Sequence, residues 1–91
     1  MNIPKFEDFQ NNLNSKCRIE FSEDCHQECE ITEVNQSAAN DQFSVIFSQA
    51  NPQIQPQGVY RVKHEALGTL DIFMVPVSGD DEAVNYEAVF T

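Results

Sequence analysis

The sequence predicts a mainly β (α+β) domain in which six antiparallel strands form a small barrel or sandwich with one N-terminal helix. Three observations support this fold class. From residue 17 to residue 90, apolar residues recur mostly at every second position, which is the period of a strand. Short turns separate the strands and leave no room for crossover helices, so the sheet is expected to be antiparallel. Only the first residues repeat at helical spacing, and 91 residues make a single domain, 1–91.

Residues 3–13 predict one short amphipathic helix. Phe6, Phe9 and Leu13 fall at helical spacing, and Pro4 suits the first turn, where its missing N–H breaks no hydrogen bond. A barrel or sandwich with this helix plugging one open end is the natural architecture.

The next segment predicts a β-hairpin. Residues 17–21 alternate between apolar and charged side chains, as a half-buried strand does. A turn over Ser22–His26 leads to a second strand at 29–31, and Val34 either continues that strand or lies at its frayed end. Residues 35–41 then form a polar loop.

Four further strands complete the sheet. They are expected at 43–47, 59–63, 69–77 and 86–90. The connections between them are a Pro/Gln loop at 51–58, a turn at 64–68 and an acidic turn at 78–82. Residues 69–77 are nearly continuous in apolar side chains, so we expect the longest strand there and place it at the centre of the sheet.

Charge and composition restrict the classes of partner. The chain has 15 acidic and 5 basic residues, a formal net charge of −10, and 41% hydrophobic residues. Such a surface repels phosphate backbones and anionic lipids, so we expect no nucleic-acid and no membrane partner. The N-terminus lacks the apolar core of a signal peptide, and the apolar runs are shorter than the ~18 residues of a membrane span. Three cysteines, an odd number, fit reduced thiols, and we expect a cytoplasmic protein.

Zinc binding is the question raised by Cys17, Cys25, His26 and Cys29, because thiolates and imidazoles are zinc ligands. Cys25 belongs to a turn and Cys29 to a strand, and no second Cys/His pair follows downstream. We therefore expect no metal. Cys17 and Cys29 are interpreted as small hydrophobic residues on the buried face of the hairpin, with Cys25 exposed. No cofactor is expected either, because no phosphate-cradling glycine loop is present.

The candidate binding residues gather within residues 57–68. They are Tyr60, Arg61, Lys63 and His64. This segment holds two of the five cationic side chains of an otherwise acidic chain. Arg61 and Lys63, two apart on one strand, point to the same face. They form either an anion-facing patch or ion pairs with acids such as Asp71 or Glu87 on neighbouring strands.

Two roles are open for His64. As a functional residue it would be a general base or a pH-sensitive binding group, flanked by Lys63 and Glu65. As a structural residue it would hydrogen-bond backbone groups of the turn ending at Gly68 and fix its shape. The structural role is preferred, because the sequence contains no G-x-S-x-G and no H-E-x-x-H motif and identifies no nucleophile for the histidine.

Several motifs together resemble a small bacterial family of uncharacterised domains, a domain of unknown function. They are Phe6-x-x-Phe9, Pro56-Gln57-Gly58-Val59-Tyr60, His64-x-x-Leu67-Gly68, Phe73-x-Val75-Pro76-Val77 and Tyr86-Glu87-Ala88-Val89-Phe90. The resemblance covers most of the chain, although the chain ends Phe90-Thr91 where Phe-Asn is usual, and its cysteines are not a family feature. It implies no established activity. Members of this family lie near tail-collar-like, phage-derived genes. The resemblance therefore implies an assembly or accessory role for this chain.

The sequence therefore predicts a non-catalytic protein-binding or assembly module, accessory to phage-tail-like structures, whose partner is a protein of unknown identity. Exposed sheet edges and the basic, histidine-containing segment are the features that a partner would contact. One alternative is an acidic inhibitor or immunity-type protein that covers a basic site. Another is a small hydrolase or isomerase that uses His64, which requires a concave pocket around the imidazole ring.

Overall fold

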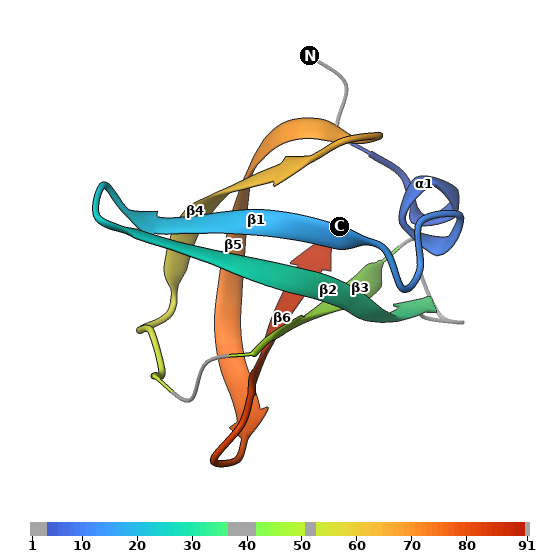
Figure 1. Ribbon diagram of the computed structural model, residues 1–91. Coiled ribbons are helices and arrows are strands. Elements are labelled where there is room, and N and C mark those ends of the chain that lie inside the picture. Colours follow the sequence, from blue (N-terminus) through green and yellow to red (C-terminus); the bar gives the residue numbers. More distant parts are fainter. Residues whose placement is uncertain (1–3, 37–41, 51–52, 91) are drawn as a thin grey trace.

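The computed structural model describes residues 4–36, 42–50 and 53–90, and these residues form one short helix and six strands (Figure 1). In chain order the elements are α1 (Phe6–Gln10), β1 (Lys16–Ser22), β2 (Cys25–Gln36), β3 (Phe43–Gln49), β4 (Gly58–His64), β5 (Gly68–Gly79) and β6 (Val84–Phe90). The predicted mainly β fold class, with six strands and one N-terminal helix, is confirmed.

The six strands close into a barrel in the order β1-β2-β3-β6-β5-β4, and every neighbouring pair is antiparallel. Strand β1 completes the circle by pairing with β4 over Arg18–Glu20. Of the two architectures left open by the sequence, the structure is the barrel. Closure also corrects one expectation: each described strand has a neighbour on both sides, so no strand offers a whole sheet edge for partner contact.

Side chains that alternate inward along each strand fill the barrel interior. Several of them have no exposed surface: Ile19, Ile31, Val45, Met74 and Tyr86. The phenol of Tyr86 is satisfied inside this core, because its oxygen accepts a hydrogen bond from the backbone N–H of Gln55 at 2.9 Å. Burial raises the pKa of Tyr86 above its ordinary value.

Helix α1 lies at one end of the barrel, on the right in Figure 1, as predicted. Its buried residue is Phe9, whose ring centroid lies 5.9 Å from that of Phe43 on β3 and 5.2 Å from that of Phe90 on β6. Three aromatic rings from distant parts of the chain therefore close this end. With five residues, α1 is too short to cross a membrane, and the described residues contain no longer helix.

The helix is shorter than the predicted 3–13, of which residue 3 lies outside the described residues. Leu13 is not on its buried face; it lies beyond the helix with 42% of its surface exposed. Beyond Gln10 the chain continues in turns over residues 11–14, and Asn14 takes a positive φ of 68°, a conformation that asparagine tolerates better than most residues. The chain reverses direction here, and the Asn14 N–H donates a hydrogen bond to the carbonyl oxygen of Ile31 at 2.7 Å.

The β1–β2 hairpin turns more tightly than predicted. Ser22 pairs with Cys25 and Glu20 with His26, so His26 lies in β2 and the turn consists of residues 23 and 24. Val34 continues β2, which runs to Gln36. Residues 37–41 of the predicted polar loop lie outside the described residues.

Strand β5 corrects a second expectation. At twelve residues it matches β2 as the longest described strand, but a closed barrel has no central strand. Inward residues alternate with exposed ones, and Phe73 and Val77 are each more than half exposed. A closed barrel has one interior, so even an apolar strand has a face directed to solvent. The pairing with β6 shifts register between Pro76 and Ser78, where proline has no N–H to donate to a ladder.

The acidic turn between β5 and β6 is present as predicted, and Asp80 organises it. The Asp80 carboxylate accepts hydrogen bonds from the N–H groups of Glu82 at 2.8 Å and Ala83 at 3.0 Å. These two bonds stabilise the charged carboxylate and hold the pKa of Asp80 below its usual value.

Candidate binding face

The four candidate residues of β4 divide between the two sides of the barrel wall. Arg61 and Lys63 are exposed on the outer surface, whereas Tyr60 and His64 are directed inward. The cause is the two-residue period of a strand, which sends successive side chains to opposite faces. The structure therefore brings Arg61 and Lys63 together on one surface and separates both from Tyr60 and His64.

His64 is held by hydrogen bonds at both ring nitrogens, and only 8% of its surface is exposed. Its Nδ1 accepts bonds from the backbone N–H groups of Ala66 at 3.0 Å and Leu67 at 3.2 Å. Its Nε2 lies 2.7 Å from the hydroxyl oxygen of Ser15. The histidine thus ties the β4–β5 turn to the segment that precedes β1, and the predicted bonds to the turn backbone are present.

The surroundings of His64 favour its neutral form. The Ser15 hydroxyl donates to the carbonyl oxygen of Asn12, so Nε2 donates its proton to the serine oxygen while Nδ1 accepts. Desolvation by burial lowers the pKa of His64 below 6.5, and the nearby Glu65 carboxylate offsets part of this effect. Both nitrogens are occupied, so the ring holds no free lone pair for accepting a substrate proton.

Tyr60 is half-buried and supports the loop before β4. Its ring packs edge-on against Phe21 with centroids 4.8 Å apart, and its hydroxyl donates to the carbonyl oxygen of Pro56. The aromatic body is therefore part of the core, and the polar end is satisfied by the backbone.

Arg61 and Lys63 each pair with an acid on a neighbouring strand. Arg61 Nε lies 3.5 Å from Asp71 Oδ1 on β5, which confirms that predicted partner. Lys63 Nζ lies 2.9 Å from Glu20 Oε2 on β1, and this hydrogen bond lowers the pKa of Glu20. Glu87 was the wrong alternative, because it lies on β6, which does not border β4.

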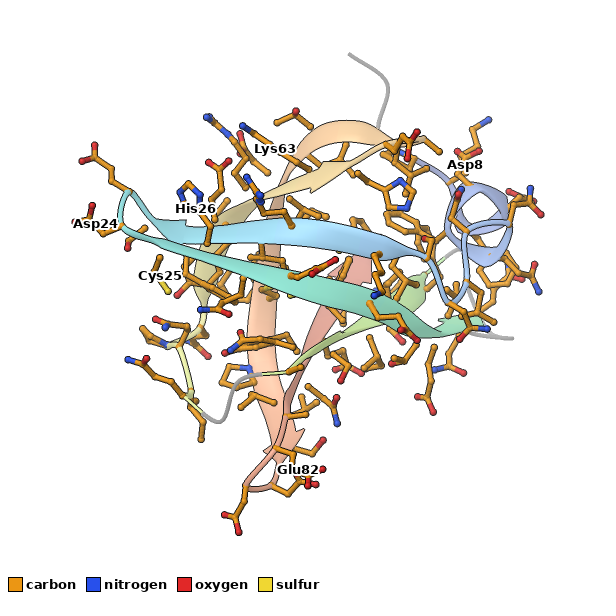
Figure 2. All side chains as sticks on the ribbon, in the orientation of Figure 1. Asp8, Asp24, Cys25, His26, Lys63 and Glu82 are labelled. Carbon is orange, nitrogen blue, oxygen red and sulfur yellow. The ribbon has the colours of Figure 1, made fainter. Side chains whose placement is uncertain are left out.

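Pairing of β1 with β4 collects charges that are far apart in the sequence. Four of the five cationic side chains lie on the outer surface of these two strands: Lys16, Arg18, Arg61 and Lys63. Acids lie between them, and one row across β2, β1, β4 and β5 reads His26, Glu20, Arg61 and Asp71. In Figure 2, Lys63 and His26 are both seen above the left half of the β1 ribbon.

An exposed apolar pair lies beside these charges. Val59 on β4 and Phe73 on β5 are direct cross-strand partners, and 64% and 53% of their respective surfaces are exposed. We call the six outward residues of this hairpin the β4–β5 face: Val59, Arg61, Lys63, Thr69, Asp71 and Phe73. This apolar pair was not predicted from the sequence, although a signal was present: Val59 has the same parity along the strand as Arg61 and Lys63.

Cys17 and Cys29 are buried cross-strand partners on the inner face of β1 and β2, as predicted. Desolvation raises the pKa of Cys17 to about 12 and raises that of Cys29 further, so both thiols stay protonated. Cys25, at the start of β2, is partly exposed. Within the described part of the chain, no three His, Cys, Asp or Glu side chains are grouped so that they could hold a metal ion.

Surface hollows lie away from the His64 ring. One of about 270 Å³ lies over β1, β2 and β3, and one of about 470 Å³ lies over β1 and β2. A third, of about 380 Å³, lies between Ile54 and the β5–β6 turn. His64 lines none of these three, so the pocket that the enzyme alternative requires is not among them.

Comparison with known proteins bears on the family alone. No curated protein and no solved structure matches the chain significantly. The family model described as Domain of unknown function (DUF6916) matches residues 4–90, which is almost the whole chain and all six strands. The resemblance to a domain of unknown function is thereby confirmed, and the chain belongs to the DUF6916 family.

Proposed function

We propose that this domain is a non-catalytic protein-binding or assembly module and that its β4–β5 face is the contact surface. The observation that carries the proposal is the exposed cross-strand pair of Val59 and Phe73. Two large apolar side chains side by side lose contact with water when a partner covers them, which favours association. The adjacent Arg61–Asp71 ion pair adds polar groups that give such a contact its orientation.

The non-catalytic part of the proposal is supported by His64. A general base needs a free nitrogen within reach of a substrate, and here Nδ1 accepts two backbone hydrogen bonds while Nε2 bonds to Ser15. Using the ring for catalysis would break the turn that it holds. We further propose that the protein is accessory to phage-tail-like structures and that it is located in the cytoplasm.

Charge distribution favours a second candidate function, an acidic inhibitor or immunity-type protein that covers a basic site. Four of the five cations lie over β1 and β4, so most of the −10 charge belongs to the rest of the surface. Asp8 on α1, Asp24 at the β1–β2 turn and Glu82 at the β5–β6 turn lie at three separate extremities (Figure 2). An acidic surface of this kind accelerates binding to a cationic protein at low salt.

A pull-down from a lysate of the source cells, read by mass spectrometry at low and high salt, tests the proposal. The immobilised baits are the wild type, Phe73→Ser, and Val89→Ser as a matched control, because Val89 is equally exposed (58%) but lies on β6. We expect a protein that the wild type and Val89→Ser retain and Phe73→Ser loses.

The other outcomes are equally informative. If Phe73→Ser retains the same protein as the wild type, the β4–β5 face is not the contact surface. A retained protein that is basic and elutes only at high salt supports the inhibitor function instead. If no bait retains a protein at either salt concentration and the chain does not associate with itself in solution either, the binding-module proposal fails.

A further inference from the structure

We infer that the partner of the β4–β5 face is a second copy of this chain, docked about a twofold axis that runs parallel to β4 and β5 and between them. This inference rests on the proposed function and names its partner. It follows from the register of the hairpin. At successive levels along the strands, Val59 lies opposite Phe73, Arg61 opposite Asp71, and Lys63 opposite Thr69.

The first two levels join groups that complement one another. Val59 and Phe73 are both apolar, and Arg61 and Asp71 carry opposite charges. At the third level Lys63 lies opposite Thr69, and its ammonium is paired with Glu20 on β1. Rotation by 180° about this axis leaves each level at the same height along the strands. It places β4 of one copy over β5 of the other. In the dimer, Phe73 of one copy therefore covers Val59 of the other, and Asp71 of one copy meets Arg61 of the other. A face with this pattern is complementary to itself, which is the requirement for an isologous contact.

Charge also selects this face for contact between copies. Two chains of net charge −10 repel each other over most of their surfaces. The β4–β5 face carries Arg61 and Lys63 against one acid, Asp71. The adjoining strand β1 adds the cations Lys16 and Arg18 and one acid, Glu20, so cations still outnumber acids here. A second acidic chain can therefore approach here without an unbalanced negative field. A strongly basic partner would bind better to the acidic remainder of the surface.

The size of the face sets the expected affinity. A stable interface buries about 800 Å² on each partner, and the paired part of β4 and β5, seven residues on each strand, offers roughly half of that or less on a convex barrel. We therefore expect a dissociation constant on the order of 0.1–1 mM for isolated chains at an ionic strength of about 0.15 M. Such a contact becomes effective where several copies are held close together, because proximity supplies a high local concentration.

Sedimentation velocity from about 10 μM to about 1 mM, a range that brackets this affinity, tests the inference. The wild type and Val89→Ser should shift from monomer to dimer over that range, whereas Phe73→Ser should stay monomeric. The sharper test uses charge. Arg61→Glu makes the second level of the face wholly negative and Asp71→Arg makes it wholly positive, so neither variant should pair with itself. An equimolar mixture should form a one-to-one dimer at least as tight as that of the wild type.

A wild type that stays monomeric at the highest concentration overturns the inference. Equal loss of dimer in Phe73→Ser and Val89→Ser places the contact elsewhere and overturns it too, as does a mixture of the two charge variants that pairs no better than either alone. Circular dichroism confirms that each variant is folded. A monomeric wild type that still captures another protein through Phe73 leaves the proposed function intact, so the two failures are distinguishable.

Discussion

At the scale of single residues, the main result is that histidine and basic side chains next to each other in the sequence serve different purposes. His64 fastens a turn from inside the barrel wall, and Lys63 forms an ion pair outside it. Sequence spacing alone could assign Arg61 and Lys63 to one face and Tyr60 and His64 to the other, because strand parity is fixed. It could not supply Ser15 or Glu20 as partners, because both contacts join segments more than forty residues apart.

His64→Ala should lower the free energy of unfolding by about 2–3 kcal/mol at neutral pH, because the two N–H groups of the turn lose their acceptor and the bond to Ser15 is lost as well. His26→Ala, an exposed histidine on β2, is the control and should cost less than about 0.5 kcal/mol. Urea unfolding followed by circular dichroism measures both. Similar costs for the two variants would contradict the structural role of His64.

The same histidine predicts a dependence of stability on pH. The pKa of His64 lies below 6.5 in the folded chain, so the unfolded chain binds the proton more readily. The stability that neutral His64 contributes is therefore fully present above about pH 6.5 and is lost as the pH falls toward the folded pKa. Urea unfolding at several pH values should show the cost of His64→Ala shrinking in acid. A cost that grows in acid would show that the pKa is raised instead.

At the scale of elements, local chemistry determined the hairpins well. The turn at 64–68 was predicted from its glycine, and its closing pair, His64 and Gly68, sets the register of the whole β4–β5 hairpin. Gly68 has a φ of +81°, which explains why glycine stands there. The same register makes Asp71 the cross-strand partner of Arg61. The predicted end of α1 at residue 13 was wrong, because residues 11–14 form turns and the Asn14 N–H bonds to Ile31 across the fold, a contact with no local signal.

Phe9→Ala tests whether α1 is part of the core. Phe9 is 1% exposed and packs against Phe43 and Phe90, so we expect a loss of about 3–4 kcal/mol in the free energy of unfolding. Leu13→Ala, just beyond the helix and 42% exposed, should cost about 1 kcal/mol or less. Differential scanning calorimetry of both variants provides the comparison. A Phe9 variant no less stable than the Leu13 variant would mean that the helix is detached from the barrel in solution.

At the scale of the whole molecule, closure of the barrel is the property that the sequence did not settle. Barrel and sandwich share the same hairpins and differ in whether β1 meets β4, a pairing with no local signal. Closure also explains the exposure of Phe73. An apolar strand such as β5 looks central in the sequence, but a barrel wall one strand thick leaves its outer side in water.

The three thiols should report this closed interior. Cys25 is partly exposed and should react with a thiol reagent such as 5,5′-dithiobis(2-nitrobenzoate) in the native protein, whereas Cys17 and Cys29 are 5% and 4% exposed with raised pKa values. We expect these two to react only as fast as the barrel unfolds. The Cys25→Ser variant should retain only the slow reaction. Rapid native labelling of all three would indicate that β1 and β2 open locally.

The short β1–β4 pairing has a kinetic consequence. It joins Arg18–Glu20 to residues 61–63 and includes the Lys63–Glu20 ion pair. Like the β3–β6 pairing, it joins strands that no turn connects, and it is the shorter of these two junctions. Bringing such distant segments together has a large entropic cost, and we expect this junction to form after the local hairpins, near the end of folding. Val62→Ala, at that junction, should therefore speed unfolding far more than it slows refolding in stopped-flow experiments. The opposite pattern would place closure of the wall at the start of folding.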